Sequence, residues 1–230
     1  MSPQQVALEI RFATAADAPR VLEIYAPYIE DTAITFEIET PSLAAFAERM
    51  DNAAHTYPYL VAEQNERIIG YAYAHPCGEK AAFGWNAELT VYLDRAFRAK
   101  GCGRLLCETL LDLLEAQGIR NVFSLITVPN EASFRLHEAL GFEYRGVQKH
   151  AGYKDDAWHD VAWLQKSFGN FSSAPSELVP ITELEDSLTT AIFARAHERS
   201  VQHMLACIAG QTTTHTSKPA MTTAGSQLDQ

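Results

Sequence analysis

A basic loop with two glycines, placed between a strand and an amphipathic helix, constrains the fold of this chain more than any other segment. Val91-Tyr92-Leu93 ends a strand pattern, the loop follows as Arg98-x-x-Gly101-x-Gly103, and leucines then recur at helical spacing until Gly118. The first N–H groups of such a helix have no intrahelical acceptor, and the helix dipole favours negative charge. The segment predicts an α/β fold with an anion-binding loop. A tight glycine turn with solvated basic side chains would explain the loop alone equally well.

The charge of this loop is opposite to that of the chain. The 230 residues carry a formal net charge of −11 with a sequence pI of about 5.1, which argues against non-specific binding to nucleic acid or to anionic membranes. Around the loop, however, Arg95, Arg98, Lys100 and Arg104 are opposed only by Asp94. This local reversal favours a small anionic ligand.

The remaining composition narrows the class of protein. No stretch reaches the roughly 18–20 apolar residues of a membrane helix, and no signal peptide is visible at the start. The four cysteines form no CxxC pair and no metal-ligand spacing, so we expect reduced, packed thiols and no bound metal. These features favour a cytoplasmic protein that acts without a metal.

The hydrophobic pattern predicts seven strands and four helices before residue 168. Strands are expected at 8–13, 59–63, 68–74, 87–93, 121–128, 142–147 and 159–164. Helices are expected after Thr14, from 41 to about 50, from the glycine loop to Gly118, and from Asn130 to Gly141. The order βααβββαβαββ predicts a mixed α/β fold with a single central sheet flanked by helices.

The chain continues well beyond this pattern. We expect the main domain to cover residues 1–168, followed by a Ser/Pro-rich extended segment at 169–182. The capping box Thr182-x-x-Glu185 predicts an amphipathic helix over 183–210, docked on the domain or on a partner. Residues 211–230 lack apolar periodicity, so we expect a disordered tail there.

Several motifs together resemble a known superfamily. They lie at 85–93 around Glu88, at 98–103, at 115–118 (Glu115-Ala116-Gln117-Gly118), at Pro129-Asn130, at 136–142 (beginning Leu136-His137-Glu138) and at 158–161 (Trp158-His159-Asp160-Val161). The chain resembles the GNAT superfamily of acyl-CoA-dependent N-acetyltransferases and, within it, the phosphinothricin N-acetyltransferase family, over residues 9–168. The resemblance implies a GNAT fold in which the sheet splays between the fourth and fifth strands.

The resemblance implies acetyl-CoA as the donor and a primary amine as the acceptor. Coenzyme A would bind through its pyrophosphate to the backbone of the glycine loop and through its pantetheine arm beside the fourth strand. Asn130 would contact the pantetheine or thioester end, or it would only cap the helix that it begins. The implied cofactor-binding residues are Val91, Tyr92, Leu93, Arg98, Ala99, Lys100, Gly101, Cys102, Gly103, Arg104, Asn130 and Ser133.

Two residues are candidates for proton transfer. Glu88 is the expected general base that takes a proton from the ammonium group, directly or through water, for which its pKa must be raised or a relay must help. The Val91 N–H is an expected donor to the oxyanion. His137 would stabilise or protonate the departing thiolate, in a direct transfer within a ternary complex. The alternatives are a salt-bridged or exposed strand carboxylate at Glu88 and a satisfied core histidine at His137.

The acceptor site follows the family less closely. The expected substrate-binding residues are Phe36, Lys80, Phe83, Trp85, Thr90 and Tyr92, whose aromatic members could equally form ordinary core. The family has basic residues at positions 78 and 80, but Gly78 removes one of these cations, and a lost charge-assisted hydrogen bond costs about 1.5–3 kcal/mol. Methionine sulfoximine or methionine sulfone is therefore an alternative acceptor to phosphinothricin.

The resemblance also implies a homodimer with acceptor pockets near the subunit contact, and a role in herbicide or antibiotic resistance. Two further functions stay open on the sequence. One is a GNAT enzyme that acetylates a peptide N-terminus, and the other is a non-catalytic acyl-CoA-binding module.

Overall fold

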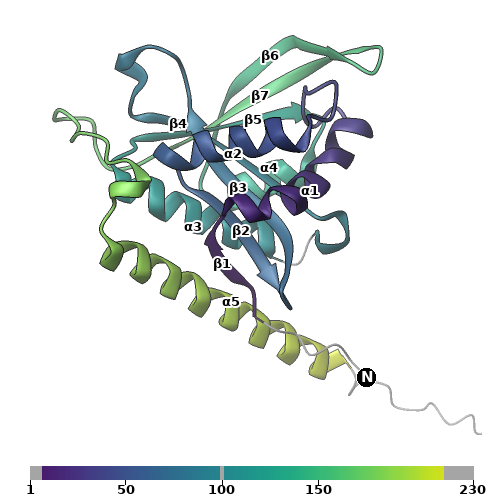
Figure 1. Ribbon diagram of the computed structural model, residues 1–230, viewed down its shortest axis with the longest axis vertical. Helices are drawn as coiled ribbons and strands as arrows, with labels where there is room; N and C mark the ends of the chain where they lie inside the picture. The colour runs from purple at the N-terminus through teal and green to yellow at the C-terminus, as the bar shows by residue number, and fades with distance from the viewer. Residues whose placement is uncertain (1–6, 99–100, 215–230) are drawn as a thin grey trace, which may run out of the picture.

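The computed structural model describes residues 7–98 and 101–214 and contains one seven-stranded sheet in the order β1-β2-β3-β4-β5-β7-β6 (Figure 1). The elements follow the predicted order along the chain. The strands are β1 (Glu9–Phe12), β2 (Tyr59–Gln64), β3 (Arg67–Pro76), β4 (Asn86–Leu93), β5 (Asn121–Val128), β6 (Glu143–Lys154) and β7 (Ala157–Ser167). The helices are α1 (Ala18–Glu30), α2 (Leu43–Thr56), α3 (Cys102–Gln117), α4 (Glu131–Ala139) and α5 (Asp186–Thr214).

The sheet opens between β4 and β5, as predicted. These two strands are the parallel pair of the sheet, and their ladder holds just three residue pairs, the last of which is Glu88 with Phe123. At the closed end, the Asn121 side chain donates to Asn86 Oδ1 at 2.9 Å. Beyond Glu88 the strands separate, β4 remaining paired with β3 and β5 with β7. The edge of β4 from Leu89 to Leu93 therefore faces an opening within the sheet.

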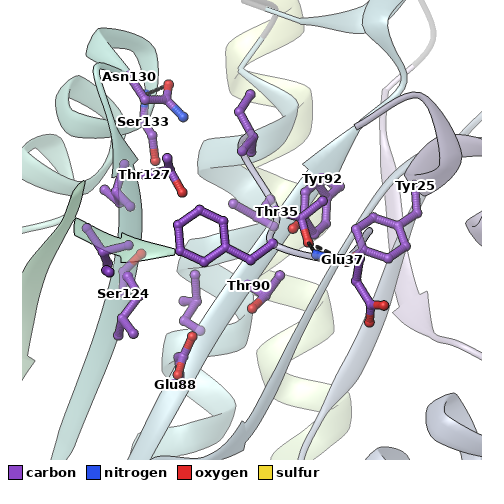
Figure 2. A pocket seen from close by; sticks show the side chains of 18 of the residues that line it. Tyr25, Thr35, Glu37, Glu88, Thr90, Tyr92, Ser124, Thr127, Asn130 and Ser133 are labelled. Carbon is purple, nitrogen blue, oxygen red and sulfur yellow. Dashed lines mark hydrogen bonds between the residues drawn. The ribbon is translucent and has the colours of Figure 1, made fainter. Parts of the chain in front are cut away.

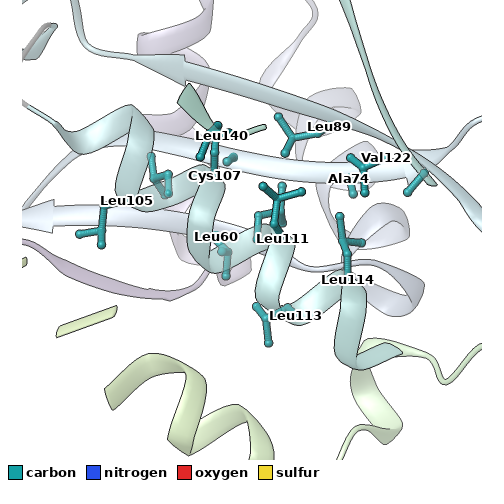
Figure 3. Close-up of a cluster of buried hydrophobic side chains, with 14 of the residues drawn as sticks. Leu60, Ala74, Leu89, Leu105, Cys107, Leu111, Leu113, Leu114, Val122 and Leu140 are labelled. Atoms are coloured by element: carbon teal, nitrogen blue, oxygen red, sulfur yellow. The ribbon is translucent and has the colours of Figure 1, made fainter. Parts of the chain in front are cut away.

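Each face of the sheet carries its own hydrophobic core. Along β2, Leu60 and Ala62 point into the core beneath α3, whereas Tyr59 and Val61 point into the core beneath α1 and α2, as the period of two in a strand requires. Figure 3 shows the leucines of α3 packed over residues of the strands. Helices on both faces thus fix the strands whose ends form the opening.

The C-terminal helix α5 lies along α3 and β1 (Figure 1). Its buried face contains Ile192 and Ala196, and Ser200 Oγ accepts a hydrogen bond from the Leu8 N–H at 2.6 Å. The predicted start is wrong by three residues, because Pro180 begins a 3₁₀ turn at Ile181–Glu183. Thr182 Oγ1 donates to the carbonyl of His55 instead of capping the helix.

The other end of the chain differs from expectation as well. The helix continues to Thr214, four residues past the expected end at 210. The remainder of the expected tail, residues 215–230, lies outside the described residues. Within the part of the chain that is described, no helix is both long and apolar enough to cross a membrane.

The hairpin of β6 and β7 is longer than the sequence patterns predicted. The predicted strands were 142–147 and 159–164, but pairing continues to Lys154 and Ala157 at the tip. Register shifts near Gly146 and between Gln148 and Gly152 interrupt the alternation of the strand, because a bulge displaces side chains from the period of two. The extension matters for function because it reaches the opening in the sheet.

Candidate active site

A cleft of about 920 Å³ occupies the opening between β4 and β5. Figure 2 shows its two walls, with Glu88, Thr90 and Tyr92 along β4 and with Ser124, Thr127, Asn130 and Ser133 on the side of β5 and α4. The rest of the lining comes from α1 and the loop after it, and from β3, β6 and β7. The cleft therefore joins side chains that lie more than half the chain apart, from Tyr25 to Val161.

Glu88 lies where the β4–β5 ladder ends. Its carboxyl group is mostly buried, and this burial raises its pKa above the usual value of a glutamate. His75 lies opposite Glu88 in the β3–β4 register, with Nε2 3.8 Å from Glu88 Oε1, and it opposes the rise in pKa. A carboxylate of raised pKa at the base of the cleft is suited to accept a proton near neutral pH.

His137 is buried in the wall formed by α4. Its Nδ1 lies 2.8 Å from the carbonyl oxygen of Ser133. Because a carbonyl can only accept, the ring carries its hydrogen on Nδ1, and a neutral ring then has a lone pair on Nε2. Burial lowers the pKa of His137, and its Nε2 has no hydrogen-bond partner among the described residues. In this state His137 can accept a hydrogen bond at Nε2 but has no proton to give there.

Asn130 combines the two roles that the sequence left open. Its Oδ1 accepts a hydrogen bond from the Ser133 N–H at 3.2 Å and so caps α4. The Asn130 and Ser133 side chains also line the cleft. Helix capping and contact with a ligand are thus compatible at this position.

The glycine loop begins α3. Gly101 is the N-cap residue with φ +80°, a left-handed conformation that favours glycine. A side chain at Gly103 would crowd Leu93 of β4 at 3.3 Å, so this glycine lets α3 approach the strand. Cys102 is buried, and burial raises the pKa of its thiol to about 12. Ala99 and Lys100 lie outside the described residues.

The arginines around this loop are largely engaged with the protein. Arg95 donates to Asp31 at 2.7 Å, and Arg104 donates to Glu108 at 2.7 Å. The Arg98 guanidinium lies over the ring of Tyr28, 4.9 Å from its centroid. Backbone N–H groups at the start of α3 are therefore a better match for an anion than a cluster of free cations.

Of the expected acceptor residues, the structure brings half to the cleft. Phe36, Thr90 and Tyr92 line it. Lys80 and Phe83 are exposed on the loop between β3 and β4, outside the lining, and Trp85 donates its Nε1–H to the Ser176 carbonyl. None of the described residues that line the cleft is a lysine or arginine.

The loop that carries Phe36 is held by a buried lysine. Lys154 Nζ donates to the carbonyls of Ile29 and Thr35, at 2.6 and 3.0 Å. The Phe36 ring packs so closely on Gly152 that a side chain there would overlap it. The tip of the β6–β7 hairpin thus fixes the loop that forms one wall.

Sequence reasoning missed several residues that line the cleft. They are Glu37, Tyr73, His75, Ser124, Thr127 and Gln148. Pairing the strands predicted at 68–74 and 87–93 would have brought residue 75 beside Glu88, because neighbouring strands share a register. Tyr73, Ser124 and Thr127 lie on β3 and β5, strands that the sequence predicted. Glu37 comes from a loop and Gln148 from the bulged part of β6, where no sequence pattern sets the direction of a side chain.

Comparisons with known proteins agree with this geometry. Residues 10–163 match the family model described as acetyltransferase (GNAT) domain. A phosphinothricin N-acetyltransferase of Streptomyces viridochromogenes is 39% identical over 184 residues, which cover 80% of this chain and 100% of that protein. An L-methionine sulfoximine/L-methionine sulfone acetyltransferase of Salmonella typhimurium is 32% identical and covers 69% of this chain and 93% of its own length.

A solved structure has the same fold. A GNAT superfamily phosphinothricin acetyltransferase from Sinorhizobium meliloti, in complex with AcCoA, gives a TM-score of 0.72 at 33% identity, covering 79% of this chain and 100% of that chain. The AcCoA in that complex supports acetyl-CoA as the co-substrate here. The family match and these relatives show that this chain is an N-acetyltransferase that belongs to the GNAT family, in which it resembles the phosphinothricin N-acetyltransferases.

Proposed function

We propose that this chain transfers the acetyl group of acetyl-CoA to the amino group of a small amino-acid-like acceptor of the phosphinothricin type. The observation that carries the proposal is Glu88, a mostly buried carboxylate of raised pKa at the point where the sheet opens. A general base so placed serves an amine, because an ammonium group cannot attack until it loses a proton. A module that only binds acyl-CoA would have no use for it.

In this proposal, coenzyme A binds along Val91, Tyr92 and Leu93 of β4, with its pyrophosphate at the start of α3. Asn130 and Ser133 contact the end of the arm that carries the acetyl group. The acceptor lies between Phe36, Thr90 and Tyr92, with its amino group toward Glu88. Transfer is direct, within a ternary complex, and the Val91 N–H stabilises the oxyanion.

His137 has a narrower role in this proposal than the sequence suggested. Its neutral ring supports a hydrogen bond from the thiol of coenzyme A to Nε2 once that thiol has formed. His137 would act as an acid only after gaining a proton at Nε2. In its neutral state, the proton that the thiolate needs comes from the amine nitrogen.

A panel of amines tests the proposal. Thiol release from acetyl-CoA is measured with L-phosphinothricin, methionine sulfoximine, methionine sulfone, ordinary amino acids and N-terminal peptides. We expect saturable turnover with amino-acid-like amines and little with peptides. No turnover with any amine, while coenzyme A still binds, would contradict the proposed function and favour a non-catalytic binding module.

Methionine sulfoximine or methionine sulfone is a second candidate acceptor. The cleft in one protomer offers no described lysine or arginine for a phosphinate, and Lys80 lies outside it. A charge-assisted hydrogen bond is worth about 1.5–3 kcal/mol, so its absence would weaken phosphinothricin binding by roughly 10–100-fold. The Salmonella typhimurium relative is named for methionine sulfoximine and sulfone. A higher kcat/KM for these amines than for phosphinothricin would favour this acceptor.

We also propose that the enzyme is a cytoplasmic homodimer and that its activity protects against an amino-acid-like inhibitor. Apolar side chains on the β6–β7 hairpin support the dimer. Tyr153 and Trp158 are opposite one another in register, with ring centroids 5.4 Å apart, and both are more than half exposed. An exposed aromatic pair of this kind is typical of a protein contact.

A further inference from the structure

His75 lies beside Glu88 in a position that connects the bottom of the cleft to solvent. The two residues are opposite one another across β3 and β4, and both line the cleft. His75 Nε2 is 3.8 Å from Glu88 Oε1, slightly beyond a direct hydrogen bond. The side chain of Glu88 is 23% exposed, whereas that of His75 is 36% exposed.

The proposed reaction gives Glu88 a proton that it must lose before the next turnover. The acceptor and the acetyl group occupy the cleft in front of the carboxyl group, so a direct exchange with bulk water is hindered while they are bound. A residue that contacts both the carboxyl group and solvent would remove this obstacle. Imidazole is suited to such a step because it gains and loses protons between pH 5 and 8.

We propose that His75 accepts the proton from Glu88 and passes it to solvent, so that the two side chains act as one proton relay. This inference rests on the proposed function. His75 acts through Glu88 and does not contact the reacting atoms. Its role is to remove the proton from Glu88 after each turnover and to lower the pKa of that carboxyl group. The rotation that closes the 3.8 Å gap, or one bridging water, completes the connection.

The proton balance of the reaction leaves one proton for this relay. An ammonium substrate loses two protons when its nitrogen becomes an amide. The first goes to the Glu88 carboxylate, then to His75 and to solvent. As the nitrogen–carbon bond forms and the carbon–sulfur bond breaks, the second goes to the thiolate of coenzyme A and forms the thiol.

The titratable groups near His75 and Glu88 do not provide this route. Tyr73 lies next to His75 on β3, with ring centroids 5.9 Å apart, and burial raises its pKa to about 12. Burial and the nearby Glu88 raise the pKa of the Cys77 thiol. From the loop after α1, Glu37 pairs with Arg49 of α2 and Glu39 is exposed at the rim. His75 is thus the imidazole placed beside Glu88 and partly exposed to solvent, as the relay requires.

The test compares the wild type with His75→Gln, which keeps the size of the side chain but cannot be protonated. His55→Gln, on α2 and outside the cleft lining, is the matched control. The carboxyl group of Glu88 is titrated by ¹³C NMR, a measurement that needs no turnover. In parallel, kcat and KM are measured against pH at low buffer concentration, with and without added imidazole.

We expect the Glu88 titration to move to higher pH in His75→Gln, because a protonated ring favours the charged carboxylate. The acid limb of kcat/KM should move in the same direction. At low buffer, kcat should fall roughly tenfold, a modest share of the effect of a general base. Imidazole should restore it, with KM for acetyl-CoA unchanged, and the His55→Gln control should behave as the wild type.

The two proposals fail in different ways. Wild-type turnover, with a Glu88 titration and a buffer dependence that His75→Gln leaves unchanged, would overturn the relay and leave the proposed function intact. Absence of turnover in the wild type would overturn the proposed function. In that case the relay would also be overturned as a catalytic device, and the titration would show whether the two groups are coupled.

Discussion

Glu88 owes its chemistry to one strand position. One residue earlier, its side chain would face the other side of the sheet, and two residues earlier it would lie within the β4–β5 ladder. At the end of the ladder it is buried enough to raise its pKa and still borders the cleft. The acid limb of the pH profile should therefore lie above the range of an exposed glutamate, since activity requires the charged carboxylate.

Replacing Glu88 by Gln should lower kcat by about 10²–10⁴-fold, the usual contribution of a general base. The affinity for acetyl-CoA should stay within about twofold, because the amide is isosteric and the expected coenzyme A site lies on Val91–Leu93 and the start of α3. Steady-state kinetics and calorimetry measure the two effects. Glu9→Gln, an exposed strand residue, is the control. Full activity of Glu88→Gln would contradict the assignment of the base.

A second carboxylate, Asp17, contributes to the stability of the fold and has no part in the proposed reaction. It accepts two hydrogen bonds from the Arg11 guanidinium, at 2.8 and 2.9 Å, and one from the Thr14 N–H. These bonds lower its pKa from 3.8 to about 2. The folded state thus binds this proton less readily than the unfolded chain, so the stabilisation is complete above pH 4 and is lost as the pH falls toward 2.

Asp17→Asn should reduce the free energy of unfolding by about 1–2 kcal/mol at pH 7. This is less than the pKa shift alone would give, because Arg11 is partly exposed and solvent screens the ion pair. The difference from the wild type should shrink between pH 4 and pH 2. Urea unfolding at several pH values measures it. The control is Asp51→Asn, on the exposed side of α2. A difference that is independent of pH would show that the ion pair is not its source.

At the scale of elements, the sequence predicted the order of strands and helices because each strand and helix has its own apolar period. The splay between β4 and β5 was expected from the family resemblance that the glycine loop and the other motifs carry, and not from the apolar periods. The late start of α5 could not be predicted, since Thr182 finds a tertiary acceptor at His55. The same is true of Trp85, whose ring nitrogen is satisfied by a carbonyl 91 residues away along the chain.

The docking of α5 gives a prediction for an element outside the matched family domain. Ile192 lies on the buried face of this helix and is 1% exposed, so Ile192→Ala should lower the free energy of unfolding by about 2–5 kcal/mol. Leu205→Ala, at a position on the same helix that is 56% exposed, should change it by less than about 0.5 kcal/mol. Thermal and urea unfolding measure both. Equal losses of stability in the two variants would mean that the face of α5 that carries Ile192 does not dock the helix on the domain.

For the whole molecule, the proposed dimer would link assembly to the cleft through the β6–β7 hairpin. Its inner side contributes Gln148 and Ala151 to the lining, and Lys154 at its tip holds the Phe36 loop. Its outer side exposes Trp158, which is 61% accessible in one protomer. If a second copy covers this surface, then dimer formation restrains the same hairpin that shapes the acceptor site.

Trp158→Lys should therefore convert the proposed dimer into a monomer, because a charge within an apolar contact is costly to bury. Sedimentation equilibrium measures the mass. Phe171→Lys is the matched control, since Phe171 is 63% exposed but lies in the segment between β7 and α5. The monomer should show a higher KM for the amine and an unchanged affinity for coenzyme A, whose expected site lies on β4 and α3. A monomeric wild type would contradict the proposed dimer. A Trp158→Lys variant that stays dimeric would show that the contact lies elsewhere.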